Sequence, residues 1–226
     1  MKIGVLFSGG KDSCLALSKA MKEHEIVCLI SIVSKNKESF MFHTPNIHIT
    51  NMQAEASGIP LVSVSTEGKK EDELKDLERA ISEAKDEYDV EGIVTGSVRS
   101  TYQSSRIETI CKKLDLWCFN PLWLIDEIEL LNEIIESGIR AIISGVFAFP
   151  LEKEMLGKPV DQELIKKLTV LKEKYSINPA GEGGEMETTT LDAPFFKKKI
   201  EPTETKTNYK DYSGTFEIEK ARFVEK

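Results

Sequence analysis

The sequence predicts an α/β protein in which a doubly wound parallel sheet is followed by a smaller α+β region. Two observations predict this class. Short apolar runs alternate with amphipathic segments over residues 1–146, and stretches bearing Thr, Tyr and Phe replace this alternation from about residue 147. We therefore expect two domains, at 1–146 and 147–226. Doubly wound sheets bind their ligands at the carboxyl ends of the strands, so we look for a site there.

Six apolar runs of strand length predict the parallel sheet. The run at 26–34 is nearly continuous Ile, Val, Leu and Cys, which is typical of a central strand buried on both faces. The expected strands are residues 3–7, 26–34, 61–65, 92–96, 117–119 and 141–144. A short apolar insert follows at 39–43, and alternation in 215–219 predicts an antiparallel strand in the second domain.

Amphipathic segments between these strands predict the helices. Gly58 and Pro60 end one helix, and the charged segment at 70–88 places its apolar residues at helical spacing. The first expected helix begins near residue 14. The others cover 47–57, 70–88, 102–114, 126–137 and 161–174.

The segment 8–13, with the sequence Ser-Gly-Gly-Lys-Asp-Ser, lies between the first strand and the first helix. Glycines have no Cβ, so the backbone turns sharply and its N–H groups approach an anion at the positive end of the helix. Lys11 adds a point charge, and Ser8 and Ser13 add hydroxyl donors. Asp12 is suited to hold the magnesium that accompanies a triphosphate. The segment therefore predicts a site for ATP with Mg²⁺.

Two common nucleotide motifs do not match this segment. A Walker A loop needs Gly and Ser or Thr where this chain has Val5 and Asp12. The dinucleotide fingerprint fails because Gly9 and Gly10 are adjacent and no third glycine follows. The segment resembles the PP-loop of ATP pyrophosphatases, which split ATP between its α and β phosphates. The alternative is a Gly-Gly turn with a helix cap and no ligand.

A second unusual segment covers 178–188, where Glu182, Glu185 and Glu187 lie on a glycine-rich loop before a Thr-rich stretch. Clustered carboxylates repel one another unless a positive group joins them. A cationic substrate group, magnesium, or an ammonium ion awaiting deprotonation would each meet this need. The alternative is a solvated acidic surface loop.

Together the two segments resemble the diphthine–ammonia ligase family, and the resemblance covers nearly the whole chain. Further stretches that resemble the family are residues 42–46, 53–55, 58–60, 102–103, 106–108 and 121–123. Two positions depart from the family pattern: Ser104, where a basic residue is common, and Met186, where an aromatic residue often occurs. Both departures concern the assignment of the substrate more than the prediction of ATP binding. The longer eukaryotic members have extra carboxyl-terminal domains, so we expect an archaeal type.

The resemblance implies ATP-dependent amidation, by ammonia, of diphthine on translation elongation factor 2, with AMP and pyrophosphate as products. Adenylation would give the diphthine carboxylate a good leaving group. The expected ATP-binding residues are Ser8, Gly9, Gly10, Lys11, Asp12, Ser13, His43, Gly96 and Ser97, with Asp12 as the Mg²⁺ ligand. The expected substrate-binding residues are Arg99, Tyr102, Arg106, Gly183, Gly184 and Glu187. The expected catalytic residues are Lys11, Asp12, Glu182 and Glu185.

Several of these residues have a structural alternative. His43 lies beside two phenylalanines and is also typical of a buried structural histidine. Arg99 and Arg106 are suited to a phosphate or carboxylate, but arginine on a helix surface is common. Tyr102 would line the diphthine pocket or pack in the core.

The composition excludes some partners. The net charge of −8 argues against nucleic acid, because Lys and Arg contacts supply most of that affinity. The compact basic run at 197–199 is typical of an edge strand. The four cysteines form no C-x-x-C pair, and no apolar run is long enough for a membrane. We expect a cytoplasmic protein, and a homodimer is one arrangement that the sequence allows.

Three other functions stay open. They are PP-loop amidation of a small-molecule carboxylate in cobalamin-related metabolism, transfer-RNA thiolation, and a non-enzymatic ATP-binding module. The acidic charge and the lack of a cysteine pair oppose thiolation. A binding module would not need the acidic loop.

Overall fold

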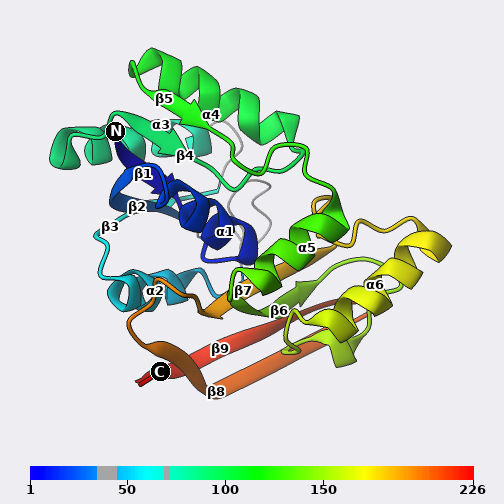
Figure 1. The fold of residues 1–226 in the computed structure, drawn as a ribbon. Helices are drawn as coiled ribbons and strands as arrows, with labels where there is room; N and C mark the ends of the chain where they lie inside the picture. Colours follow the sequence, from blue (N-terminus) through cyan, green and yellow to red (C-terminus); the bar gives the residue numbers. More distant parts are fainter. Residues whose placement is uncertain (35–44, 69–71) are drawn as a thin grey trace.

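Figure 1 shows the chain as a computed structural model, which describes residues 1–34, 45–68 and 72–226. Its larger sheet is parallel throughout and has the strand order β3-β2-β1-β4-β5. The strands are β1 (Lys2–Leu6), β2 (Glu25–Ser34), β3 (Leu61–Thr66), β4 (Gly92–Val94) and β5 (Trp117–Phe119). Strands β2 and β3 follow β1 on one side of the sheet, and the chain then returns to place β4 and β5 on the other side. At such a change of direction the expected ligand site is a crevice at the carboxyl ends of the strands. The α/β class is confirmed.

The helices lie where the amphipathic segments predict them. They are α1 (Lys11–Ala20), α2 (Thr50–Ser57), α3 (Asp72–Tyr88), α4 (Thr101–Lys113), α5 (Glu127–Glu136) and α6 (Gln162–Tyr175), with short 3-10 turns η1 (Ile47–Ile49) and η2 (Lys153–Met155). Side-chain caps explain several of the starts. Asp126 accepts from the first amides of α5, and Asp161 does the same for α6.

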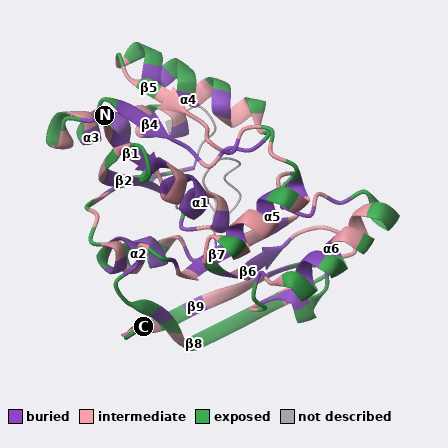
Figure 2. Cartoon of the chain, viewed as in Figure 1, coloured by how far each residue is buried: buried purple, intermediate pink, exposed green. Residues whose placement is uncertain are grey.

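Different helices cover the two faces of the parallel sheet. Ile3 and Val5 of β1 pack in a core with α1 and α5, whereas Ile30 and Ile32 of β2 pack in a second core with α3 and α4. The first core continues into the smaller sheet, for example at Ile143. The strands of the parallel sheet are mostly buried, as Figure 2 shows, and β8 is exposed along most of its length.

The smaller sheet is antiparallel, with the strand order β7-β6-β9-β8. Its strands are β6 (Arg140–Val146), β7 (Met186–Asp192), β8 (Lys199–Lys210) and β9 (Ser213–Val224). The expectation that 141–144 extends the parallel sheet is wrong, because β6 pairs with β7 and β9. A short apolar run does not specify its partner strand. The chain leaves the parallel sheet after β5 and enters the antiparallel sheet at β6. The division into domains at 1–146 and 147–226 stays a prediction.

Candidate active site

The PP-loop turns tightly at the carboxyl end of β1. Gly9 has a φ of +77°, which favours glycine, and Gly10 is the N-cap of α1 without a side-chain cap. A Cβ at Gly10 would lie 3.2 Å from the carbonyl oxygen of Thr188, and one at Gly96 would lie 2.8 Å from the amide nitrogen of Ser13. Glycine is therefore needed where the loop after β4 and strand β7 approach the amino end of α1.

Strand β7 of the smaller sheet holds the PP-loop from the side. The amide of Thr190 donates to the carbonyl oxygen of Gly9 at 2.9 Å, and the amide of Lys11 donates to Thr188 Oγ1 at 3.1 Å. Gln53 of α2 completes this support, since its Nε2 donates to the carbonyl oxygens of Gly9 (2.9 Å) and Thr190 (2.7 Å). The loop is thus held by strand β7 of the smaller sheet and by helix α2.

Lys11 connects the PP-loop to the acidic loop. Its side chain is buried, and Nζ donates to Asp12 Oδ2 at 2.7 Å and to the carbonyl oxygen of Ala180 at 2.6 Å. The other oxygen of the Asp12 carboxylate, Oδ1, is buried and has no hydrogen-bond partner among the described residues. A buried carboxylate oxygen without a donor is costly, so it is ready to accept a cation or a proton.

The acidic loop folds around the side chain of Asn178. Its Oδ1 accepts from the amides of Ala180 (2.9 Å) and Glu182 (3.5 Å). The Glu185 carboxylate turns back onto the same loop, where Oε1 accepts from the Asn178 amide at 3.1 Å and Oε2 from the Gly183 amide at 2.8 Å. Glu185 therefore fastens the loop and does not face the site cavity.

The other two glutamates of the loop face the cavity beside Asp12. Burial, followed by the negative charge of Asp12, raises the pKa of Glu182, although Lys11 and the amides of Arg99 and Val98 partly offset this. Burial also raises the pKa of Glu187, from 4.5 to about 7; Lys11 opposes the increase, and Asp12 and Glu182 add to it. Carboxylates with raised pKa values are suited to accept a proton near neutral pH.

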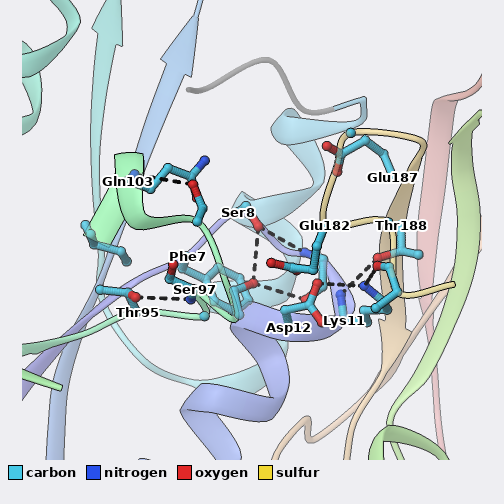
Figure 3. Close-up of a pocket in the computed structure, with 18 of the residues that line it drawn as sticks. Phe7, Ser8, Lys11, Asp12, Thr95, Ser97, Gln103, Glu182, Glu187 and Thr188 are labelled. Carbon is cyan, nitrogen blue, oxygen red and sulfur yellow. Dashed lines mark hydrogen bonds and ion pairs between the residues drawn. The ribbon is translucent and has the colours of Figure 1, made fainter. Parts of the chain in front are cut away.

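These residues surround one cavity of about 450 Å³ at the carboxyl ends of β1 and β4. Figure 3 shows Glu182 pointing toward Ser8 and Asp12, with Glu187 and Thr188 on the strand beside them. One wall is polar and includes Asp12, Ser97 and Glu187; an apolar part is formed by side chains such as Ile32 and Ile107. A tight turn at the amino end of a helix, an apolar wall and carboxylates that face the cavity are what binding a nucleotide and activating a second substrate require.

Comparison with known proteins identifies the family. A family model described as the diphthamide synthase N-terminal domain matches residues 1–117, and one described as the diphthamide synthase C-terminal domain matches residues 126–224. The chain belongs to the diphthamide synthase family. The family expected from the sequence is confirmed.

Curated relatives of this diphthamide synthase family member share about a third or more of its residues. The diphthine–ammonia ligase of Danio rerio is 38% identical over 226 residues, which cover 91% of this chain and 88% of that one. The diphthine–ammonia ligases of Bos taurus and Homo sapiens are 38% and 37% identical, over 88% of this chain and 82% of each relative.

The cavity brings together most of the site residues that the sequence predicts. Among the predicted residues, those that line it are Ser8, Gly10, Lys11, Asp12, Ser13, Gly96, Ser97, Glu182, Gly183, Gly184 and Glu187. Gly9 shapes the turn and is not in the lining. His43 lies outside the described residues. Lys11 has two of its contacts with Asp12 and Ala180, so the lysine that the sequence assigns to phosphate also binds the acidic loop.

Three predicted substrate-binding residues are not in the cavity lining. Arg99 forms an ion pair with Glu127 at 3.0 Å. Arg106 lies over the ring of Tyr102, with its guanidinium carbon 3.4 Å from the ring centroid, and donates to the Tyr102 carbonyl oxygen at 3.2 Å. Arg106 and Tyr102 therefore contact each other on α4.

The structure adds lining residues that sequence reasoning missed. Thr95 donates to Asn120 Oδ1 at 2.6 Å and accepts from the Ser97 amide at 3.1 Å, which shapes the loop after β4. Gln103 lies in the first turn of α4, where Ser100 caps its amide. Thr95 and Gln103 follow strand β4, and this position after a parallel strand could have predicted them. Thr188 ends the acidic segment 178–188, but its contact with Lys11, 177 residues away, could not be predicted from a local pattern.

The site is compatible with a magnesium ion that accompanies ATP. No group of three or more His, Cys, Asp or Glu side chains within residues 1–34, 45–68 and 72–226 is placed to hold a metal. Asp12 lines the cavity and its Oδ1 has no hydrogen-bond partner among the described residues, and Mg²⁺ commonly uses one carboxylate together with phosphate oxygens and water. Asp12 would hold the ion, which would supply charge neutralisation for the leaving pyrophosphate.

Proposed function

We propose that this chain is a diphthine–ammonia ligase, which activates the carboxylate of diphthine with ATP and forms diphthamide, AMP and pyrophosphate. One observation carries the proposal: Lys11 donates both to Asp12 and to the Ala180 carbonyl oxygen, so the phosphate site and the acidic loop form one cavity. The names of the relatives support the same reaction.

The PP-loop serves the first step, in which a carboxylate oxygen attacks the α-phosphorus and the bond to pyrophosphate breaks. Charge accumulates on the leaving pyrophosphate. The amides of the Gly9–Gly10 turn and the amino end of α1 offer preorganised positive charge there. Asp12 would hold the magnesium, and the Lys11 ammonium, 2.7 Å from Asp12 Oδ2, stabilises the ionised Asp12 carboxylate.

Glu187 and Glu182 serve the second step, in which nitrogen bonds to the acyl carbon and the bond to AMP breaks. Ammonium has no lone pair until it loses a proton. Glu187, with its pKa raised to about 7, is matched to accept that proton near neutral pH. Glu182 lines the same cavity beside Asp12 and provides negative charge for an ammonium ion or for the trimethylammonium group of diphthine. Glu185 fastens the loop and takes no part in proton transfer.

The remaining parts of the proposal concern location and partners. We propose that the protein substrate is translation elongation factor 2 that carries diphthine and that free ammonia is the nitrogen donor. We also propose a cytoplasmic location. No helix in the described part of the chain is long and apolar enough to cross a membrane. A homodimer stays a prediction.

The test combines the protein with magnesium ATP, ammonium chloride and diphthine-bearing elongation factor 2. AMP release and the mass of the factor are followed together. We expect AMP only when all components are present, with the mass change of a carboxylate converted to an amide. The matched control is the same factor without diphthine, which should release no AMP above background.

The other outcomes separate the alternatives. ATP binding without AMP or a mass change on a competent factor would reject diphthine and favour a small-molecule carboxylate. Thiolation would require a reactive cysteine at the ATP. Cys111 and Cys118 contact each other, but Cys111 lies in the core that packs α3 and α4, and no cysteine lines the cavity. Glu187→Gln should slow amidation far more than Glu185→Gln.

A further inference from the structure

Glu127 is a buried carboxylate that the proposed reaction does not use. It is the first residue of α5 and is 7% exposed, yet it is not among the residues that line the site cavity. Lys172 of α6 donates to its Oε2 at 2.9 Å, and the Arg99 guanidinium forms an ion pair with its Oε1 at 3.0 Å. Two cations from different segments therefore hold one carboxylate between them.

The contacts of Glu127 close a ring around Glu182. Arg99 binds Glu127 Oε1 through its guanidinium, and its backbone amide donates to Glu182 Oε2 at 3.3 Å. On the other side, Asn178 Nδ2 lies 3.5 Å from the same Glu127 oxygen, and Asn178 Oδ1 accepts from the Glu182 amide at 3.5 Å. Glu127 thus contacts two of the residues that bind Glu182, Arg99 at its carboxylate and Asn178 at its backbone, while the Val98 amide also binds the carboxylate.

A purely structural role for Glu127 explains less. The first turn of α5 is already capped by Asp126, which accepts from the amides of Ile128 and Glu129. An ion pair that only stabilised α5 would not need burial. Glu133, also on α5, forms a partly exposed ion pair with Lys19 of α1. Burying a carboxylate is expensive unless its partners are well placed. At Glu127, burial fixes the positions of the Arg99 guanidinium and the Asn178 side-chain amide, which both contact its carboxylate.

We propose that Glu127 is a positioning residue, which sets the place of the Glu182 carboxylate in the active site through Arg99 and Asn178. The inference rests on the proposed function, in which Glu182 supplies charge beside the ATP phosphates. The PP-loop makes none of the contacts of this ring, so ATP binding should be largely independent of Glu127. The charge on Glu127 matters because the guanidinium of Arg99 is oriented by a carboxylate, and a neutral amide orients it less firmly.

A double-mutant cycle tests the link. The variants are Glu127→Gln, Glu182→Gln and the pair together, assayed for AMP release with elongation factor and ammonium. Changing a residue that orients a metal ligand typically costs ~10–100-fold in activity, and we expect a loss of similar size for a residue that orients Glu182. We expect kcat of Glu127→Gln to fall within this range with the KM for ATP unchanged within about twofold. The double variant should match Glu182→Gln, because residues that act through one another are not additive.

Two further variants separate positioning from folding. Glu133→Gln is the matched control on α5, and it should keep the wild-type rate because its Lys19 partner is not part of the ring. Arg99→Ala cuts the ring at a partly exposed side chain and should reproduce Glu127→Gln even where that variant is unstable. If Arg99 contacts the substrate directly, its loss will instead add to that of Glu182→Gln, and the proposal is refuted.

A structure of Glu127→Gln decides the inference independently of turnover. We expect Glu182 Oε2 to move out of hydrogen-bond distance of the Arg99 amide, from the present 3.3 Å. An unchanged contact refutes the inference, as does a double variant whose losses multiply. Wild-type protein that releases no AMP with the diphthine-bearing factor overturns the proposed function alone, because the position of Glu182 is still measured.

Discussion

Glu187→Gln is expected to stabilise the protein at alkaline pH while it slows amidation. The pKa of Glu187 is about 7 in the folded protein, against an ordinary 4.5, mainly because the carboxylate is buried. An acid with a raised folded-state pKa contributes its full stability below pH 4.5, where it is protonated in both states. That contribution is lost as the pH rises through 7. Glutamine never ionises and so avoids the loss.

The two pKa values of Glu187 set the magnitude. At ~1.4 kcal/mol per pKa unit, the difference between 4.5 and about 7 corresponds to ~3 kcal/mol at pH 8. This is an upper limit, because Glu187 keeps some exposed surface in the cavity, where water screens its charge. We expect Glu187→Gln to gain ~1–2 kcal/mol in unfolding free energy relative to wild type between pH 5 and pH 8, measured by urea denaturation.

Glu185→Gln is the matched control, because Glu185 lies two residues away on the same loop but is satisfied by two amides. Losing charge there should cost ~1 kcal/mol at both pH values, since hydrogen bonds to a charged acceptor are stronger. The two variants therefore have opposite signs at pH 8. If the stability of Glu187→Gln relative to wild type does not grow between pH 5 and pH 8, the ionised carboxylate is not costly and its assignment as the base fails.

Three further substitutions test the PP-loop. Gly9→Ala should destabilise the protein by ~1–2 kcal/mol and raise the Kd for ATP at least ~10-fold by calorimetry, because φ is +77° and the new Cβ meets Gln53. Gly184→Ala is its control, with a φ of +83° but open space, and should lose stability without losing ATP. Asp12→Asn should lower AMP formation ~100-fold and shift the Mg²⁺ titration to higher concentration, as expected for loss of a metal-ligand charge. Lys11→Met should lower the unfolding free energy by ~2 kcal/mol, because the Ala180 carbonyl oxygen loses its donor, and an unchanged urea midpoint would contradict this.

Local patterns were sufficient to predict the elements and the PP-loop. The segment 8–13 is contiguous, and its position between a strand and a helix follows from the residues on either side. The same reasoning failed for β6, since an apolar run specifies burial and leaves the choice of neighbour to the rest of the sheet. Pairing with β7 and β9 depends on residues about 40 to 70 positions away, which a local pattern does not contain.

From the sequence we assign Glu182 and Glu185 to catalysis and Glu187 to substrate binding, but no local signal separates their roles. Glu182, Glu185 and Glu187 share one glycine-rich stretch, and spacing alone gives them similar prospects. The fold separates them, because the turn through Gly183 brings the Glu185 carboxylate onto the amides of Asn178 and Gly183. Arg99 illustrates the same limit: the sequence predicts that it binds substrate, but its ion-pair partner, Glu127, starts a helix 28 positions later.

Strand β7 places the two halves of the proposed chemistry on adjacent residues. Thr188 accepts from the Lys11 amide and holds the PP-loop, while Glu187, next to it, faces the cavity. Neighbouring residues on a strand keep a fixed separation, so the cradle for the phosphates and the proposed base cannot move apart without breaking the strand. The Lys11–Ala180 bond fixes the preceding loop to the same cradle. Nucleotide binding and carboxylate amidation are thus joined by the smaller sheet, which explains why the parallel sheet alone does not contain the site.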